Sequence, residues 1–257
     1  MRKKHHHLLE DEGESYFASF TDLLVGIIFI FIILLTQSAE QFKAKTDSDL
    51  AAQEARSAVL NAIVNDLKAQ SIRIEFDIKN GIIRLPEGVV FDVGQSDLAE
   101  DKKPKVHKIF ETIGNYLPCL TDSTKNNDFC TKKFPFYAKP YKDRPRLNTL
   151  LIEGHTDKQK YANDAYGNWK LSVNRAVNVY QFFWENFPDI RDLTNQDKQN
   201  LISVSGYGDT RPLPDENADL LDNPKDRRID LRFVMETSEP EPVKEIKQDT
   251  ELQHAAP

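Results

Sequence analysis

The amino-acid sequence predicts an α+β domain that follows a single N-terminal membrane helix. Three observations support this fold class. Residues 17–36 form one long apolar run, apolar and polar residues alternate over residues 72–78, and residues 106–117 carry apolar side chains at helical spacing. A chain of 257 residues has room for one ordinary domain with short attachments.

The composition excludes several classes of protein. The chain carries 34 Lys and Arg against 41 Asp and Glu, a net charge of −7, and 39% of its residues are hydrophobic. These values exclude a polytopic membrane protein and a fully disordered chain. No segment gathers the basic stripe that phosphate contacts need, so nucleic acid is not an expected partner.

The apolar run is predicted to be an uncleaved anchor. Residues 17–36 (FASFTDLLVGIIFIFIILLT) are long enough to cross the ~30 Å hydrocarbon core as a helix. A cleaved signal peptide with its core at 23–35 is the alternative, but four of the five residues at positions 10–14, where its basic region would lie, are acidic. We therefore expect a stub at 1–15 and a membrane helix at 16–37, and the basic residues 2–4 favour a cytoplasmic N-terminus.

Asp22 is the unusual residue of this run. A carboxylate inside a membrane helix costs about 2.5–3.5 kcal/mol, and such residues usually face other helices or an ion path. Asp22 could instead be the N-cap of a helix that begins after it, although residues 23–35 alone are too short to span. As a protonatable group it could alternate between neutral and ionised states, and partner helices are then implied.

The stretch 38–71 is predicted to be a linker helix. Leu60, Ile63, Val64 and Leu67 recur at helical spacing. Two interpretations remain open, namely a surface helix packed on the domain that follows and a short dimerising stalk. The linker is then followed by the alternating pattern of the domain.

The first half of the domain is predicted as a hairpin, a strand and a helix. Residues 72–78 and 82–85 are the strands, and Asn80-Gly81 is the turn. Residues 89–91 could form another short strand, and Asp97 could cap a helix that ends near Leu117. Residues 118–146 read as an inserted loop without regular structure, and the Pro- and Glu-rich tail 237–257 as disordered.

Cys119 and Cys130 are the only cysteines and bracket a polar stretch. They would form a disulfide in an oxidising compartment and stay free thiols in a reducing one. A pair of thiols supplies too few ligands for a metal.

Four motifs follow in order: GHTD at 154–157, NWKLSVNRA at 168–176, GYG at 206–208 and DRRIDL at 226–231. This ordered set resembles the OmpA-like peptidoglycan-binding domain over residues 72–236. The resemblance implies an α/β sandwich with helices on one face of a mixed sheet. It also implies a ligand, the diaminopimelate of the stem peptide, and hence a periplasmic domain, which favours the Cys119–Cys130 disulfide.

The resemblance implies a zwitterion-binding site. Asp157 would take the ammonium of diaminopimelate, and Arg175 would grip its carboxylate bidentately. The other implied residues shape or flank the pocket: Thr156, Asn168, Leu171, Tyr207 and Arg228. A structural Arg175–Asp157 ion pair, a packed Tyr207 and a core Leu171 are the alternatives.

The order of the parts resembles a MotB-type stator subunit. The run S-x-T-D-x-x-V-G around Thr21 and Asp22 and the long insertion resemble the ZorB family, the stator-type subunits of the Zorya anti-phage defence system. This implies ion translocation through Asp22 and Thr21, with protons favoured over sodium ions. It also implies a dimer threaded through a MotA- or ZorA-like partner, expected as a pentamer, in the bacterial inner membrane.

Other classes remain as alternatives to this prediction. A flagellar MotB-type stator subunit and a passive tether between membrane and wall share the same parts, although a tether has no need of Asp22. An enzyme is not expected, because the P-loop, HExxH and GxSxG motifs are missing. Neither a cofactor nor a metal is predicted, since His155 and Asp157 alone are too few ligands.

Overall fold

The structure is a computed structural model that describes residues 6–123, 127–140, 143–161, 166–214 and 220–236. Of residues 6–16 and 18 it describes the backbone only. The chain divides into two compact units, residues 1–48 with 238–257 and residues 49–237. The predicted disordered tail lies outside the described residues.

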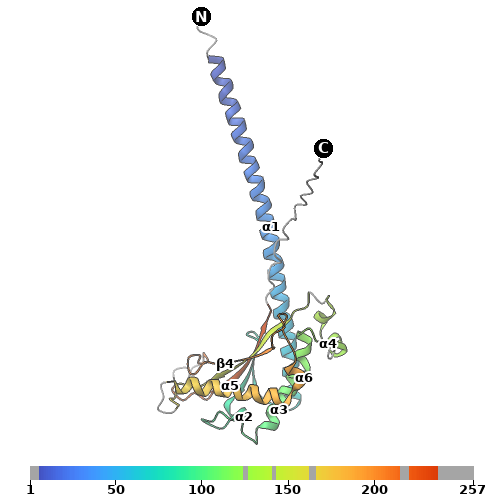
Figure 1. Cartoon of the computed structure of the whole chain (residues 1–257), viewed down its shortest axis with the longest axis vertical. Helices are drawn as coiled ribbons and strands as arrows, with labels where there is room; N and C mark the ends of the chain where they lie inside the picture. Colours follow the sequence, from blue (N-terminus) through green and yellow to red (C-terminus); the bar gives the residue numbers. More distant parts are fainter. Residues whose placement is uncertain (1–5, 124–126, 141–142, 162–165, 215–219, 237–257) are drawn as a thin grey trace, which may run out of the picture. The chain divides into compact units, whose positions relative to one another are not determined.

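One long helix, α1 (His6–Ala69), begins in the first unit and ends in the second (Figure 1). Its section Ser19–Ala69 is long and apolar enough to cross a membrane, and its most apolar window has no buried residue. The helix begins at residue 6, within the predicted stub, and continues without a break through residue 37 into the predicted linker.

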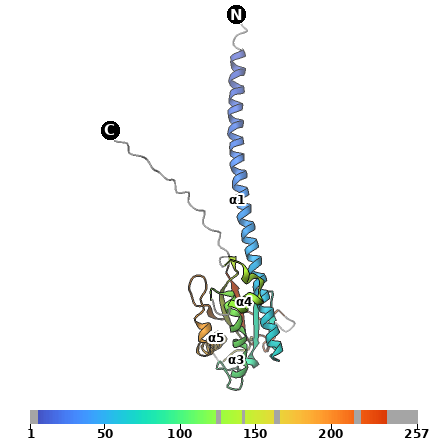
Figure 2. The ribbon, with the colours of Figure 1, turned by 90° about the vertical axis from the view of Figure 1, so that its right-hand side faces the viewer.

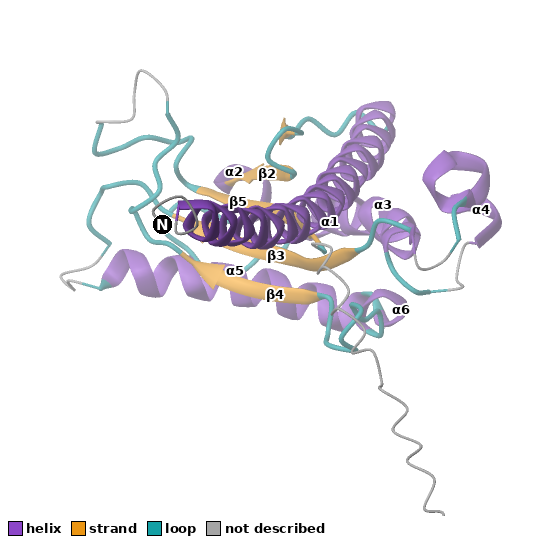
Figure 3. Ribbon diagram, turned by 90° about the horizontal axis from the view of Figure 1, so that it is seen from above, coloured by secondary structure: helices purple, strands orange, loops and turns teal. Residues whose placement is uncertain are grey.

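The second unit is built on a mixed sheet of five strands in the order β1-β2-β5-β3-β4. The strands are β1 (Glu75–Asp77), β2 (Ile82–Pro86), β3 (Leu147–His155), β4 (Ile202–Gly206) and β5 (Arg228–Met235). Neighbours are antiparallel except β3 and β4, which are parallel. A parallel pair needs a crossover, and α5 (Gly167–Asn186) lies between the two strands in the sequence and beside them in Figure 3.

The sheet has one apolar face and one charged face, because side chains alternate along each strand. On β5, Ile229, Leu231 and Phe233 belong to the hydrophobic core, together with side chains of α1, α3 (Lys103–Tyr116) and α5. The intervening Arg228 and Asp230 are buried on the opposite face. The predicted α+β class with an apolar N-terminal helix is therefore confirmed.

The last turns of α1 belong to the core of the domain. Leu60, Ile63 and Leu67 have no exposed surface. The hydroxyl of Tyr116 on α3 donates to Asp66, and Gln70 Nε2 donates to Thr112 Oγ1 at 3.0 Å. Figure 2 shows the last turns of α1 against the domain. Of the two interpretations of the linker, the structure shows the packed helix over this part.

Three local predictions were wrong. Residues 89–91 are not a strand, since α2 (Glu87–Val90) occupies most of them and Phe91 makes only an isolated bridge to Leu98. Asp97 does not cap α3, which begins at Lys103 with a proline in its first turn, where proline is favoured. Asp97 instead accepts a hydrogen bond from Asn178 Nδ2 at 3.0 Å. Strand β1 is also shorter than the alternating pattern at 72–78.

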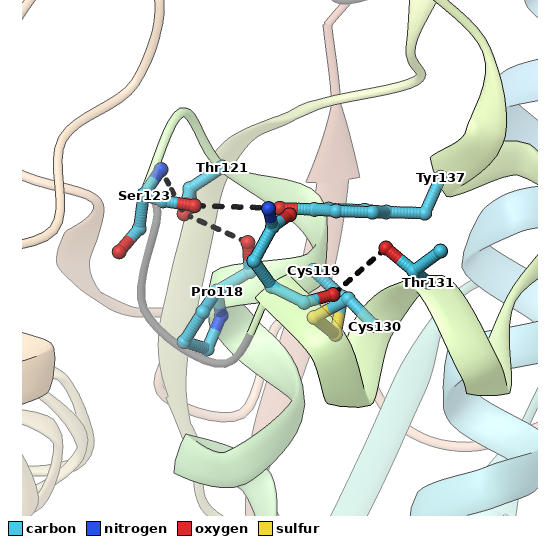
Figure 4. The surroundings of a disulfide bond; sticks show 8 residues. Pro118, Cys119, Thr121, Ser123, Cys130, Thr131 and Tyr137 are labelled. Carbon is cyan, nitrogen blue, oxygen red and sulfur yellow. Dashed lines mark hydrogen bonds between the residues drawn. A yellow bond between two sulfur atoms is a disulfide. The ribbon is translucent and has the colours of Figure 1, made fainter.

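The predicted inserted loop contains short helices and a disulfide. The segments are η1 (Leu117–Leu120), α4 (Asn127–Lys133) and η2 (Pro135–Ala138). Cys119 and Cys130 are bonded, with their Cα atoms 5.3 Å apart, and both are buried (Figure 4). The disulfide therefore joins η1 to α4, and the predicted disulfide is confirmed. The prediction that this segment lacks regular structure was wrong. Two aromatic side chains of the segment, Phe134 and Tyr137, are buried in the core and attach the segment to it.

Candidate functional site

The site lies where β3 and β4 end side by side. Because these strands are parallel, the GHTD and GYG motifs that end them meet at one edge of the sheet. Thr156 N donates to Gly208 O at 2.9 Å, and Tyr207 N donates to Gly154 O at 3.0 Å. These two hydrogen bonds hold the motifs in register beyond the strands.

The first turns of α5 pack directly on these strand ends. A Cβ atom on Gly154 would lie 1.9 Å from Ser172 O, so only glycine fits against the helix. Ser172 Oγ accepts from Gly208 N at 2.9 Å and donates to Trp169 O at 2.9 Å. Gly208 has φ +53°, which glycine adopts without strain. The NWKLSVNRA helix is thereby placed against the loops that carry the site.

Asp157 is buried directly after β3, with 4% of its surface exposed. Its Oδ2 accepts from Arg227 Nη1 at 2.5 Å, and its Oδ1 accepts from Gln159 N at 3.2 Å. Burial raises the pKa of Asp157 against the opposing effect of Arg227. Asn168 Nδ2 donates to Asp157 O at 3.3 Å, so the predicted Asn168 supports the backbone of this turn.

Arg175 is almost fully buried, with 1% of its surface exposed. Its Nη2 donates to Glu87 Oε1, and its Nε donates to Gln95 O at 2.8 Å. The guanidinium also lies 5.1 Å from the ring centroid of Phe91. Arg175 is therefore held by the segment 87–95, and the alternative of a direct Arg175–Asp157 ion pair is not among its described contacts.

Glu87 and Arg227 join the two predicted ligand-binding residues. Glu87 Oε2 accepts from Arg227 Nε at 2.8 Å while its other oxygen accepts from Arg175. Arg227 also donates to Asp222. Although burial opposes it, hydrogen bonds to Asp157, Asp222 and Glu87 raise the pKa of Arg227 above its usual range. Neither residue was predicted from the sequence. Glu87 lies far from the motifs, and in the DRRIDL motif Arg228 was predicted in place of Arg227.

The remaining predicted residues divide between two places. Leu171 and Thr156 are buried beside the site, as the core alternative for Leu171 requires. Tyr207 stacks on His155 with centroids 5.2 Å apart, and the guanidinium of Arg211 lies 3.6 Å from its ring. Arg228 lies on the charged face of the sheet, where its Nε donates to Asp230 at 3.1 Å, and its described contacts include neither Asp157 nor Arg175.

The charged face contains one group of possible metal ligands among the described residues. Glu153, His155 and Asp230 place ligand atoms within 4.8 Å of one another, all buried. Arg232 already donates to Glu153 at 2.7 Å and Arg228 to Asp230. Burial, with the charge of surrounding arginines, lowers the pKa of His155 to about 2. The carboxylates are thus neutralised by arginines, and this donor set does not fit a cation.

Asp22 and Thr21 lie in the other unit, inside α1. Thr21 Oγ1 donates to Phe17 O at 2.8 Å, within the helix. The Asp22 side chain is exposed on the surface of the helix. Since α1 extends on both sides of Asp22, the N-cap alternative is wrong.

Comparison with known proteins agrees with this geometry. The model of the OmpA family matches residues 132–220, which include three of the four site motifs. The chain is 27% identical over 257 residues to the protein YtxE of Bacillus subtilis (strain 168), covering 85% of this chain and 88% of that protein. It is 33% identical over 95 residues to Motility protein B of the same organism, covering 35% of this chain and 33% of that protein.

Among solved structures, a MotB-like protein from Desulfovibrio vulgaris aligns with a TM-score of 0.44 and 19% identity, covering 73% of this chain and 94% of that chain. The domain at residues 49–237 is OmpA-like, because the OmpA family model matches residues 132–220 within it. Among the described residues one apolar helix precedes this domain, and the similarity to Motility protein B covers 35% of the chain.

Proposed function

We propose that this chain is a peptidoglycan-anchored stator subunit of a MotA/MotB-like membrane motor. It would cross the inner membrane once, with its N-terminus in the cytoplasm and its OmpA-like domain in the periplasm. The observation that carries the proposal is the pairing of two features on one chain. A buried site unites Asp157 with Arg175, and an apolar helix contains Asp22.

The wall-binding half rests on the chemistry of the site. The free end of diaminopimelate carries an ammonium and a carboxylate. Asp157 offers an acceptor for the first and Arg175 a donor for the second. Asp157 is held by Gln159 N in the turn after β3, and Arg175 by Gln95 O in the segment 87–95. Thr156, Asn168, Leu171 and Tyr207 would support this site. Arg228 would hold the neighbouring loops, because it donates to Asp226 O and Arg211 O.

Peptidoglycan sedimentation tests this half. We expect Arg175→Ala and the near-isosteric Asp157→Asn to weaken binding of the detergent-solubilised chain to purified sacculi at least about tenfold, the scale of a charge-assisted hydrogen bond. Asp77→Asn, which removes a partly exposed carboxylate from β1, is the control and should bind normally. Unchanged binding by folded Asp157→Asn protein would remove this residue from the site.

The ion-translocating half rests on Asp22. The side chain lies in a helix whose following residues are apolar, so in a membrane it needs partner helices to cover it. This favours a dimer of the chain within a MotA- or ZorA-like pentamer. Protons are the proposed ion, because beyond Thr21 no oxygen ligand flanks Asp22 in the sequence.

Asp22→Asn tests this half, since it removes the titratable carboxyl at equal volume. We expect the variant to assemble with its partner and bind sacculi normally but to lose motor function and proton flux. Thr21→Ser, which keeps a hydroxyl, is the milder control. Normal proton flux through Asp22→Asn complexes would refute the ion path and leave only a tether.

We further propose that the motor acts in anti-phage defence of the Zorya type. The S-x-T-D-x-x-V-G run and the disulfide-containing segment support this over the flagellar alternative. Plaque assays with the chain and its neighbouring genes should show protection that Asp22→Asn abolishes. Restored swimming of a motB-deficient strain, without protection, would instead favour the flagellar role.

A further inference from the structure

Glu87 uses both of its carboxylate oxygens to bridge two arginines in the site. Oε1 accepts from Arg175 and Oε2 accepts from Arg227 Nε at 2.8 Å. The Glu87 side chain is 6% exposed and lies before the first strand-end motif, at the start of α2. Asp157 and Arg175 already match the ammonium and the carboxylate of a zwitterionic ligand end. Contact with the ligand therefore does not explain why Glu87 is buried here.

Three buried charges and the partly buried Arg227, whose side chain is 18% exposed, form a network of alternating sign. Arg175, Glu87, Arg227 and Asp157 follow one another through ion pairs, and their charges sum to zero. Asp222, which also contacts Arg227, has a side chain 65% exposed and is screened by water. Since an uncompensated buried charge is costly, any change that leaves this network with a net charge is unfavourable.

A ligand would enter this network by exchange. A carboxylate that takes Arg175 Nη2 replaces Glu87, and an ammonium that takes Asp157 Oδ2 replaces Arg227. When both exchanges occur, Glu87 and Arg227 keep each other as partners and the buried site stays neutral. A carboxylate alone leaves one excess negative charge, and an ammonium alone leaves one excess positive charge.

We propose that Glu87, together with Arg227, determines the specificity of the site by occupying Arg175 in place of the ligand's carboxylate, so that only a zwitterionic ligand end is admitted. This inference rests on the proposed peptidoglycan-binding function. It assigns Glu87 and Arg227 a role distinct from that of Asp157 and Arg175, which contact the ligand. It also predicts that neutralising one bridge residue changes which ligand is preferred.

The test measures affinities of three probes for the full chain in detergent by calorimetry: diaminopimelate, pimelate and 1,5-diaminopentane. The wild type should prefer diaminopimelate to either of the others by at least about tenfold. Glu87→Gln leaves the empty site with one excess positive charge, so the preference for diaminopimelate over pimelate should fall about tenfold. Arg227→Gln has the opposite effect and should shift preference toward the diamine.

Glu153→Gln is the matched control, because Glu153 is also buried and paired with an arginine, Arg232 at 2.7 Å, but lies on the charged face of the sheet. Its probe preferences should equal those of the wild type. Circular dichroism identifies unfolded variants, and if Glu87→Gln does not fold, Arg227→Gln decides the question.

Folded variants that keep the wild-type preferences would overturn the inference, and so would a Glu87→Gln protein that binds no probe. Sedimentation of the wild type with sacculi separates the two claims. Binding to sacculi with unshifted preferences refutes only the role of Glu87, whereas a wild type that binds neither sacculi nor diaminopimelate refutes the proposed function as well.

Discussion

His155 shows how strongly a single buried residue can be constrained. It lies at the end of β3 with 1% of its surface exposed, stacked on Tyr207 and surrounded by arginines. Burial and then the charges of Arg228 and Arg211 lower its pKa from 6.5 to about 2. The folded protein therefore keeps the imidazole neutral at every physiological pH, while the unfolded chain titrates normally.

This difference predicts acid sensitivity. The stability contribution of neutral His155 is fully present above pH 6.5 and is lost as the pH falls below that value, because only the unfolded state then binds the proton. We expect about 2 kcal/mol of unfolding free energy to be lost between pH 6.5 and pH 5. Denaturant titrations across this range should show a shallower slope for His155→Asn, whereas His107→Gln, at an exposed position, should keep the wild-type slope.

At the scale of elements, the contact between β3 and α5 depends on a missing side chain. The Cβ of an alanine at 154 would overlap the backbone oxygen of Ser172, which cannot rotate away. We expect Gly154→Ala to destabilise the domain by about 3 kcal/mol or more, the upper range of overpacking. Gly88→Ala meets nothing within 4 Å and should be close to neutral. Equal melting temperatures of the two variants would show that α5 can shift freely.

The disulfide is a second stabilising element. It closes a loop between positions 119 and 130, and chain-entropy arguments assign such a loop about 3 kcal/mol. The double variant Cys119→Ala, Cys130→Ala should therefore melt lower than the oxidised wild type. It should also match the wild type measured in a reducing agent; a larger loss in the variant would mean that the thiols themselves contribute packing.

The strands and helices show which predictions could be made from the sequence alone. Strand β2 and helix α3 were predicted because their apolar pattern extends over several residues. Residues 89–91 failed because a short apolar run has no distinguishable period, and burial of Val89 and Val90 in α2 decided the outcome. Asp157 and Arg175 were predicted from motifs, whereas Glu87 and Arg227 were missed because their importance arises only from contacts across 140 positions of sequence.

At the scale of the whole molecule, the boundary of the folded domain lies inside α1. Leu60, Ile63 and Leu67 are fully buried, so the last turns of this helix complete the core. We expect a fragment of residues 49–237 to fold cooperatively and a fragment of residues 71–237 to unfold or aggregate, since each lost side chain contributes about 1.5–3 kcal/mol. Thermal melts of the two purified fragments check this, and a cooperative melt of the shorter one would place the boundary after α1.

The oxidation state of Cys119 and Cys130 also reports whether a chain has reached an oxidising compartment. Bonded sulfurs do not react with maleimides, and these are the only cysteines in the sequence. In cells quenched with acid before lysis, chains retained on the cytoplasmic side would take up the label and migrate more slowly on a gel. On the proposed topology, the ratio of the two bands gives the fraction of chains whose C-terminal domain has crossed the membrane.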